Sequence, residues 1–208
     1  MPKVYSERER EKIVKKLKKA ANELMMKKGV KKATVDELVM KAGIPKGTFY
    51  LFYPCKEVLF FDAAQDFHVR VDEHIASGML RIISENKIDP AEDGAFSDCM
   101  DEVVDVILGA MEITYNSCLK VLLEPEAMNL VLSKLPDDLL EKHREQDKEM
   151  GAGIVEQLVA KKGLDVNAVV GSFSMILLGS MYKHVIGEEN LRESMRMLVK
   201  GVVMQILA

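Results

Sequence analysis

The chain has 208 residues, of which 48% are hydrophobic and 30% are charged, with 14 Met and no Trp. This composition is typical of a soluble, mainly helical protein and excludes an intrinsically disordered one. Its three cysteines are widely spaced, without a Cys-x-x-Cys pair or a nearby histidine, so we expect a reduced, cytoplasmic chain with no metal site. The N-terminus is polar, and no apolar run approaches the roughly 18 residues of a membrane-spanning helix.

Charge is distributed unevenly along the chain. Residues 1–56 carry 15 Lys and Arg against 6 Asp and Glu, whereas the remaining residues carry 14 against 27. Because Lys and Arg bind nucleic acids by neutralising phosphates, this asymmetry predicts that the N-terminal part meets a polyanion and the acidic part does not. A solvated basic helix face is the alternative interpretation.

The first predicted helix begins at Ser6, which forms a capping box with Glu9. Apolar residues recur behind it at steps of three and four, the spacing of one helix face, and Gly29 is the expected end. The residues of this face are Ile13, Leu17, Ala20, Ala21 and Leu24.

Two short helices are predicted next. Thr34 and Glu37 form a second capping box, which opens a helix over residues 35–42. Pro45 then marks the start of a third helix, from residue 46 to about residue 52, because proline suits the first turn. A long helix followed by two short ones around a Gly-containing turn is the arrangement that places its last helix in a DNA major groove. An ordinary helical hairpin has the same spacing.

The rest of the sequence is helical in pattern. A long helix begins near Lys56 and is expected to be interrupted near Gly78, and residues 87–96 form the clearest loop. Residues 100–115 carry a clean apolar stripe that predicts a buried helix. The helices around 137–163 and 166–186 are expected to form a homodimer interface, since the small residues of the second allow close approach of another copy. Packing within one chain is the alternative.

One segment carries a family resemblance. Residues 34–50, Thr-Val-Asp-Glu-Leu-Val-Met-Lys-Ala-Gly-Ile-Pro-Lys-Gly-Thr-Phe-Tyr, continuing to Leu59, resemble the DNA-binding signature of the TetR family of helix-turn-helix transcriptional regulators. The resemblance implies an all-α fold, with a three-helix DNA-binding domain at 1–53 and a helical effector-binding and dimerisation domain at 54–208. It also implies a homodimeric repressor that is released from a palindromic operator in double-stranded DNA by a small hydrophobic effector, with no cofactor.

The resemblance assigns DNA contacts residue by residue. The implied roles are a phosphate at a helix N-terminus, base edges or phosphates at the recognition helix, close backbone approach at its glycine, and a phosphate clamp at the start of the following helix. The residues, in chain order, are Thr34, Lys46, Gly47, Thr48, Tyr50 and Lys56. Three neighbouring aromatic residues are expected to pack inward instead, namely Phe49, Phe52 and Tyr53.

Two positions depart from the family pattern. Pro45 stands where many relatives carry a hydroxyl capping residue, so one capping or phosphate contact is missing. Cys55 stands where Ser or Asn commonly caps the next helix. It could loosen that junction or supply a thiol, and a plain substitution is the simpler interpretation.

An effector site is expected between the helix beginning at Lys56 and the helix of residues 100–115, at Phe67, Met111 and Tyr115, although core packing explains the same residues. A regulator that responds to a protein or to thiol oxidation instead is a second hypothesis. A helical-bundle enzyme is a third. The sequence offers no catalytic residues for it, because it has no Gly-x-Ser-x-Gly motif, no Gly-rich phosphate loop and no Glu-x-x-His pair.

Overall fold

The computed structural model describes residues 5–90, 92, 94–141 and 159–207, and every regular element in these ranges is a helix. The expected all-α fold is therefore confirmed. The elements are α1 (Glu7–Lys32), α2 (Val35–Ala42), α3 (Lys46–Phe49), α4 (Lys56–Asn86), the 3₁₀ turn η1 (Ser97–Cys99), α5 (Met100–Tyr115), α6 (Leu119–Leu122), α7 (Pro125–Leu132), α10 (Val166–Ser180), α11 (Lys183–Ile186) and α12 (Glu188–Leu207).

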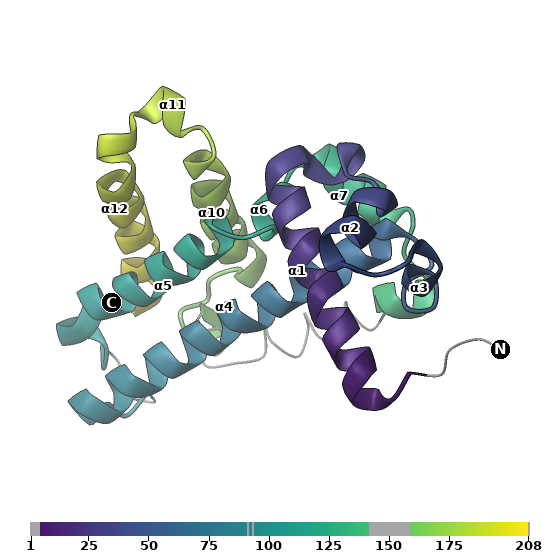
Figure 1. Cartoon of the computed structure of the whole chain (residues 1–208). Helices are drawn as coiled ribbons and strands as arrows, with labels where there is room; N and C mark the ends of the chain where they lie inside the picture. The colour runs from purple at the N-terminus through teal and green to yellow at the C-terminus, as the bar shows by residue number, and fades with distance from the viewer. Residues whose placement is uncertain (1–4, 91, 93, 142–158, 208) are drawn as a thin grey trace. The chain divides into compact units, whose positions relative to one another are not determined.

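The chain divides into two compact units, the first formed by Met1–Val69 together with Asn116–Glu141. In this unit α1 packs against α2, α6 and α7, and α2 packs against α3 (Figure 1). The unit therefore contains more of the chain than the domain expected at residues 1–53. Its core is built on fully buried side chains from five elements, including Leu17, Leu38, Phe49, Leu59 and Val131.

The helix boundaries of this unit follow the predicted capping signals. Ser6 caps α1 in a capping box with Glu9, and Thr34 does the same for α2 with Glu37. Gly29 takes a positive φ of 73° and kinks α1, after which one further turn runs to Lys32. Glycine adopts this backbone conformation at no steric cost, so the predicted stop acts as a kink near the end of the helix.

The third helix is shorter than expected. Residues 46–49 are α-helical, and the prediction that the helix continues to about residue 52 is wrong. Beyond it the chain makes tighter turns, in which the amides of Leu51 and Phe52 donate to carbonyls three residues back, at 3.2 and 2.9 Å. The backbone then leaves the helix at Tyr53, so that α3 is a single turn with an irregular extension.

The second unit is formed by Arg70–Tyr115 and Lys142–Ala208, so α4 begins in the first unit and ends in the second. Within this unit α12 packs against both α5 and α10 (Figure 1). Its core includes the predicted stripe of α5, with Val103, Val104, Leu108 and Met111 buried. Ion pairs from Arg196 and Lys200 of α12 to Asp101 of α5 border this contact.

Two predicted boundaries in this unit are wrong. α4 continues through Gly78 without a break, because the missing side chain makes room for Val106 of α5. The helix expected at 166–186 ends at Ser180, and the separate short helix α11 follows. The other expected dimerisation segment, 137–163, lies largely outside the described residues. None of the helices in the described part of the chain combines the length and the apolar character that crossing a membrane requires.

The close approach of α4 and α5 gives a stability prediction. A Cβ at Gly78 would lie 2.6 Å from Cγ2 and 2.9 Å from Cγ1 of Val106, a side chain that is stiff at χ1. Gly78→Ala should destabilise the protein by about 1 kcal/mol, since overpacking outweighs the gain in helix propensity. Urea denaturation measures this free energy. The control is Ser77→Ala, an exposed neighbour that should change it by less than about 0.5 kcal/mol. Equal stability of both variants would refute the packing argument.

Candidate nucleic-acid interface

The residues expected to contact DNA around α3 differ in exposure. Lys46 and Gly47 are exposed, and Tyr50, which follows the helix, is 53% exposed. Thr48 is only 7% exposed, and Phe49 is fully buried, as expected from its spacing. The single turn of α3 thus presents a lysine, a glycine and a tyrosine outward. No side chain caps the N-terminus of α3, whose N-cap residue is Pro45.

Lys46 is held by a carboxylate of the preceding helix. Its Nζ lies 2.9 Å from Oδ1 of Asp36 in α2, and both side chains are more than half exposed. The hydrogen bond to Asp36 raises the pKa of Lys46, so the ammonium is charged at neutral pH. An exposed pair of this kind contributes little to stability, so a phosphate can replace the carboxylate at little cost.

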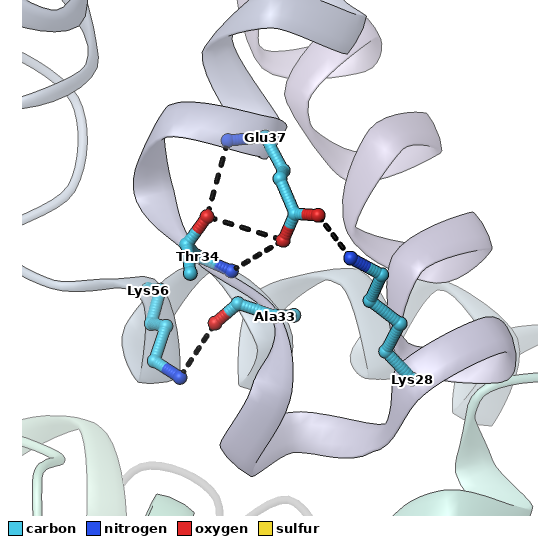
Figure 2. Close-up of polar contacts among 5 residues, drawn as sticks. All are labelled: Lys28, Ala33, Thr34, Glu37 and Lys56. Atoms are coloured by element: carbon cyan, nitrogen blue, oxygen red, sulfur yellow. Dashed lines mark hydrogen bonds and ion pairs between the residues drawn. The ribbon is translucent and has the colours of Figure 1, made fainter.

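The start of α2 is closed by side chains of the chain itself. Figure 2 shows Oγ1 of Thr34 accepting from the amide of Glu37, at 3.3 Å, while the Glu37 carboxylate accepts from the amide and hydroxyl of Thr34. Lys28 of α1 donates to the same carboxylate, and this contact is the largest cause that lowers the pKa of Glu37. These hydrogen bonds confirm the predicted capping role of Thr34. Thr34 is also exposed, so its side chain lies at the surface where the helix begins.

Lys56 is engaged with the end of α1. Its Nζ donates to the carbonyl oxygens of Val30 at 2.7 Å, Ala33 at 2.8 Å and Lys31 at 3.3 Å (Figure 2 draws the bond to Ala33). An ammonium group has three donors, and the last carbonyls of a helix lack partners within it. Lys56 therefore caps α1 from α4, a role that sequence spacing did not reveal.

A polar network, which the sequence analysis missed, anchors the segment behind α3. Tyr53 is 6% exposed, and its hydroxyl donates to Oδ2 of Asp62 in α4 at 2.6 Å. Lys18 of α1 pairs with Asp62 at 3.0 Å and with Asp66 at 2.7 Å. Burial opposes the charge of Lys18, but these hydrogen bonds hold its pKa above the usual value. The network ties α1, α4 and the recognition segment together.

A second unforeseen cluster lies at the N-terminal end of α1. The hydroxyl of Tyr5 is 3.1 Å from Oγ1 of Thr48, and its ring lies 6.0 Å from that of Phe52. The guanidinium of Arg10 sits 4.8 Å from the centre of the same Phe52 ring, a cation–π distance. These contacts join residues more than 40 positions apart. The sequence alone does not predict them, because nothing in the local pattern around Tyr5 points to Thr48.

The three residues expected at an effector site fall in different units. Phe67 belongs to the first unit and packs against its core, whereas Met111, 7% exposed, belongs to the core of the second. Tyr115 is half-buried at the end of α5. A small hollow in the second unit is lined by residues such as Phe96, Lys162 and Leu207, and none of the three lines it.

The buried cysteines are unsuited to thiolate chemistry. Burial raises the pKa of Cys118 to about 12, and burial also raises that of Cys99. A protonated thiol is a poor nucleophile, so these two residues do not favour a redox response at neutral pH. Cys55 is half-buried. Nowhere in the described ranges do His, Cys, Asp and Glu side chains gather in a group of three that could hold a metal ion.

The segment around α2 and α3 is similar in sequence to known regulatory proteins. Residues 17–63 match the family model described as bacterial regulatory proteins, tetR family, and the match runs from within α1 to the first turns of α4. It covers α2, α3 and the segment anchored by Tyr53. No curated protein matches the chain.

Solved structures share the fold over nearly the whole chain. A TetR-family transcriptional regulator from Streptomyces coelicolor is 16% identical at a TM-score of 0.50, covering 94% of this chain and 99% of its own. The fatty acid degradation regulator FadR from Bacillus halodurans is 17% identical at a TM-score of 0.51, covering 99% of this chain and 97% of its own. At these low identities the likeness shows only that the fold is shared, and the shared fold includes the second unit. Residues 17–63 thus match the tetR family of bacterial regulatory proteins, and nearly the whole chain shares its fold with these two solved regulators.

Proposed function

We propose that the protein is a homodimeric repressor that leaves a palindromic operator when a small hydrophobic molecule binds its second unit. The observation that carries the DNA-binding part is the exposed face of α3, where Lys46, Gly47 and Tyr50 project from a turn whose Phe49 is fully buried. A rigidly seated turn with an exposed cation and an exposed hydroxyl is suited to a phosphate-lined groove. The expected domains, 1–53 and 54–208, remain part of this proposal.

Each expected contact has a distinct role in the proposal. Lys46 exchanges Asp36 for a phosphate, Gly47 allows close approach of the backbone, and the Tyr50 hydroxyl donates to the DNA backbone. Thr34 brings the N-terminus of α2 to a phosphate, where the helix dipole favours an anion. Lys56 adds its charge nearby while capping α1. Thr48 lies beneath this surface and is treated in the next subsection.

The pair between Lys46 and Asp36 gives the first test of this surface. Lys46→Ala should weaken binding to a duplex that the wild-type protein selects from a random-sequence library. It should also reduce the log–log salt slope by about 0.9 for each phosphate that the variant no longer neutralises. Asp36→Asn should tighten binding, because it removes both the competitor for Lys46 and a carboxylate that repels phosphate. Fluorescence anisotropy across a salt series measures affinity and slope. An unchanged slope in Lys46→Ala would remove this lysine from the interface.

Substitution of Lys56 distinguishes its capping of α1 from a contact with phosphate. Lys56→Met should lower the melting temperature, because three carbonyls at the C-terminal end of α1 lose their donor. It should also reduce the salt slope measured with the same duplex. A fall in melting temperature with an unchanged slope would confine Lys56 to capping. Lys28→Met is the matched control, since it loses a bond to Glu37 and should leave the carbonyls of α1 capped.

The proposed dimer uses apolar side chains that the single chain leaves exposed. Val170 and Leu178 of α10 are 58% and 40% exposed, and Met197 and Met204 of α12 are 70% and 50% exposed. Residues spaced by seven or eight positions share one side of a helix, so each of the two helices carries an apolar face. Met175, also on α10, is 68% exposed. A second copy of the chain is the partner, and twofold symmetry would bring two recognition helices to one palindrome.

Light scattering tests this dimer. Met175→Glu should convert the dimer to a monomer at micromolar concentration, because it places a charge in the apolar contact. The matched control is Leu80→Glu, which changes a side chain of α4 that is 62% exposed, and it should remain dimeric. The monomeric variant should also lose dyad-symmetric footprints. Dimers that persist in Met175→Glu would place the interface elsewhere.

The proposed effector site lies on α5, at Met111 and Tyr115. The methionine supplies an adaptable apolar wall and the tyrosine a single polar group, which is the usual composition of a small-molecule site. The effector acts only through its different affinity for the DNA-bound and released states, typically about 1–3 kcal/mol of coupling. Phe67 was expected at the same site, and we propose no contact for it with Met111.

Substitution at Met111 tests this placement. A thermal-shift screen against hydrophobic metabolites first identifies a ligand that stabilises the wild-type protein. Met111→Trp should abolish this shift and the ligand's effect on operator binding, with operator affinity nearly intact. Met111→Leu conserves volume and should keep the response. A full response in Met111→Trp would move the site away from α5, and loss of operator binding in a folded variant would do so too.

A further inference from the structure

We infer that Tyr5 is part of the DNA-binding surface. Its hydroxyl, which lies beside Thr48, donates to a backbone phosphate in place of the Thr48 hydroxyl. The inference rests on the DNA-binding function proposed above. It concerns a residue before the first helix, outside the segment of residues 17–63 that the family model matches.

Thr48 and Tyr5 share a hydrogen bond but differ in exposure. Thr48 lies in the single turn of α3, yet it is 7% exposed, and its Oγ1 is 3.1 Å from the hydroxyl of Tyr5. The tyrosine is half-buried, so it lies nearer the solvent than the threonine that it contacts. Tyr5 is thus the more exposed of the two side chains that share this hydrogen bond.

Tyr5 is fixed to the recognition segment at two points. Its hydroxyl contacts Thr48 within α3, and its ring packs on Phe52 behind α3, at 6.0 Å and an interplanar angle of 56°. Phe52 in turn packs against the core of the first unit. The phenol therefore occupies a defined place beside α3, which makes its hydroxyl preorganised for a contact.

The chemistry around the phenol favours an anionic partner. A phenol has one donor and can also accept, so Tyr5 can accept from Thr48 while donating outward. The exposed guanidinium of Arg10 lies 4.8 Å from the centre of the Phe52 ring, so a cation shares the aromatic residue that holds Tyr5. A hydroxyl donor beside an exposed cation favours an anion. Among the groups of a duplex that anion is a phosphate oxygen, which accepts from tyrosine in many complexes.

The test compares hydroxyl deletions that leave shape unchanged. Tyr5→Phe and Thr48→Val are measured by anisotropy with the duplex that the wild-type protein selects from a random library, and with an unrelated duplex of equal length. Tyr5→Phe should bind both duplexes roughly three- to tenfold more weakly, the effect of removing one hydrogen bond. Thr48→Val should lose less, since Phe52 still holds the phenol. Tyr182→Phe, which removes an exposed hydroxyl from the second unit, is the control and should bind like wild type.

Several results would overturn the inference. A larger loss in Thr48→Val than in Tyr5→Phe would give the contact to the threonine. Unchanged or tighter binding by Tyr5→Phe would show that the phenol contributes nothing or screens the recognition turn. A loss confined to the selected duplex would assign the hydroxyl to a base edge instead. Urea denaturation confirms that each variant is folded. Failure of the wild-type protein to select any duplex would instead refute DNA binding itself, which keeps the two failures distinct.

Discussion

A recognition helix of a single turn has no stability of its own, and the rest of the first unit is arranged around this constraint. Short isolated helices are unstable in water, because the nucleation cost is not repaid by a few hydrogen bonds. In this protein the turn is held from below by Phe49, which is fully buried, and from behind by Tyr53, whose hydroxyl reaches Asp62 of α4. Burial of the aromatic ring stabilises the turn, and the hydrogen bond to the carboxylate fixes its orientation.

The junction between α1 and α2 solves a related problem. At residues 30–34 the carbonyl end of one helix meets the amide end of the next, so groups of opposite partial charge are left without helical partners. Lys56 donates to the carbonyl groups, and Thr34 with Glu37 accepts from the amide groups. Lys28 then links Glu37 back to α1. The junction is therefore closed by the chain's own side chains, and α2 presents its first turn in a fixed direction.

The sequence predicted those features that depend on neighbours along the chain. Both capping boxes, the inward packing of Phe49 and the buried stripe of α5 are read from local spacing, and all are present. The family that the resemblance named is also the one whose model matches residues 17–63. The short extent of α3 and the continuity of α4 through Gly78 were not predicted, because tertiary packing overrides local propensity at both places. The partners of Lys56, Tyr53 and Tyr5 were missed for the same reason, since each lies on a separate element.

The first unit is discontinuous in sequence, because Asn116–Glu141 returns to it after α5. The side chain of Asn22 in α1 accepts from the amide of Cys118, and α6 and α7 cover α1 and complete its core. The helix-turn-helix is thus not an independent cassette. A chimaera that joins the N-terminal residues of this protein to the sensor domain of a relative would have to carry residues 116–141 as well, or supply an equivalent cover for α1. Evolution faces the same restriction, so exchange of sensor domains by a single recombination point would leave part of this core uncovered.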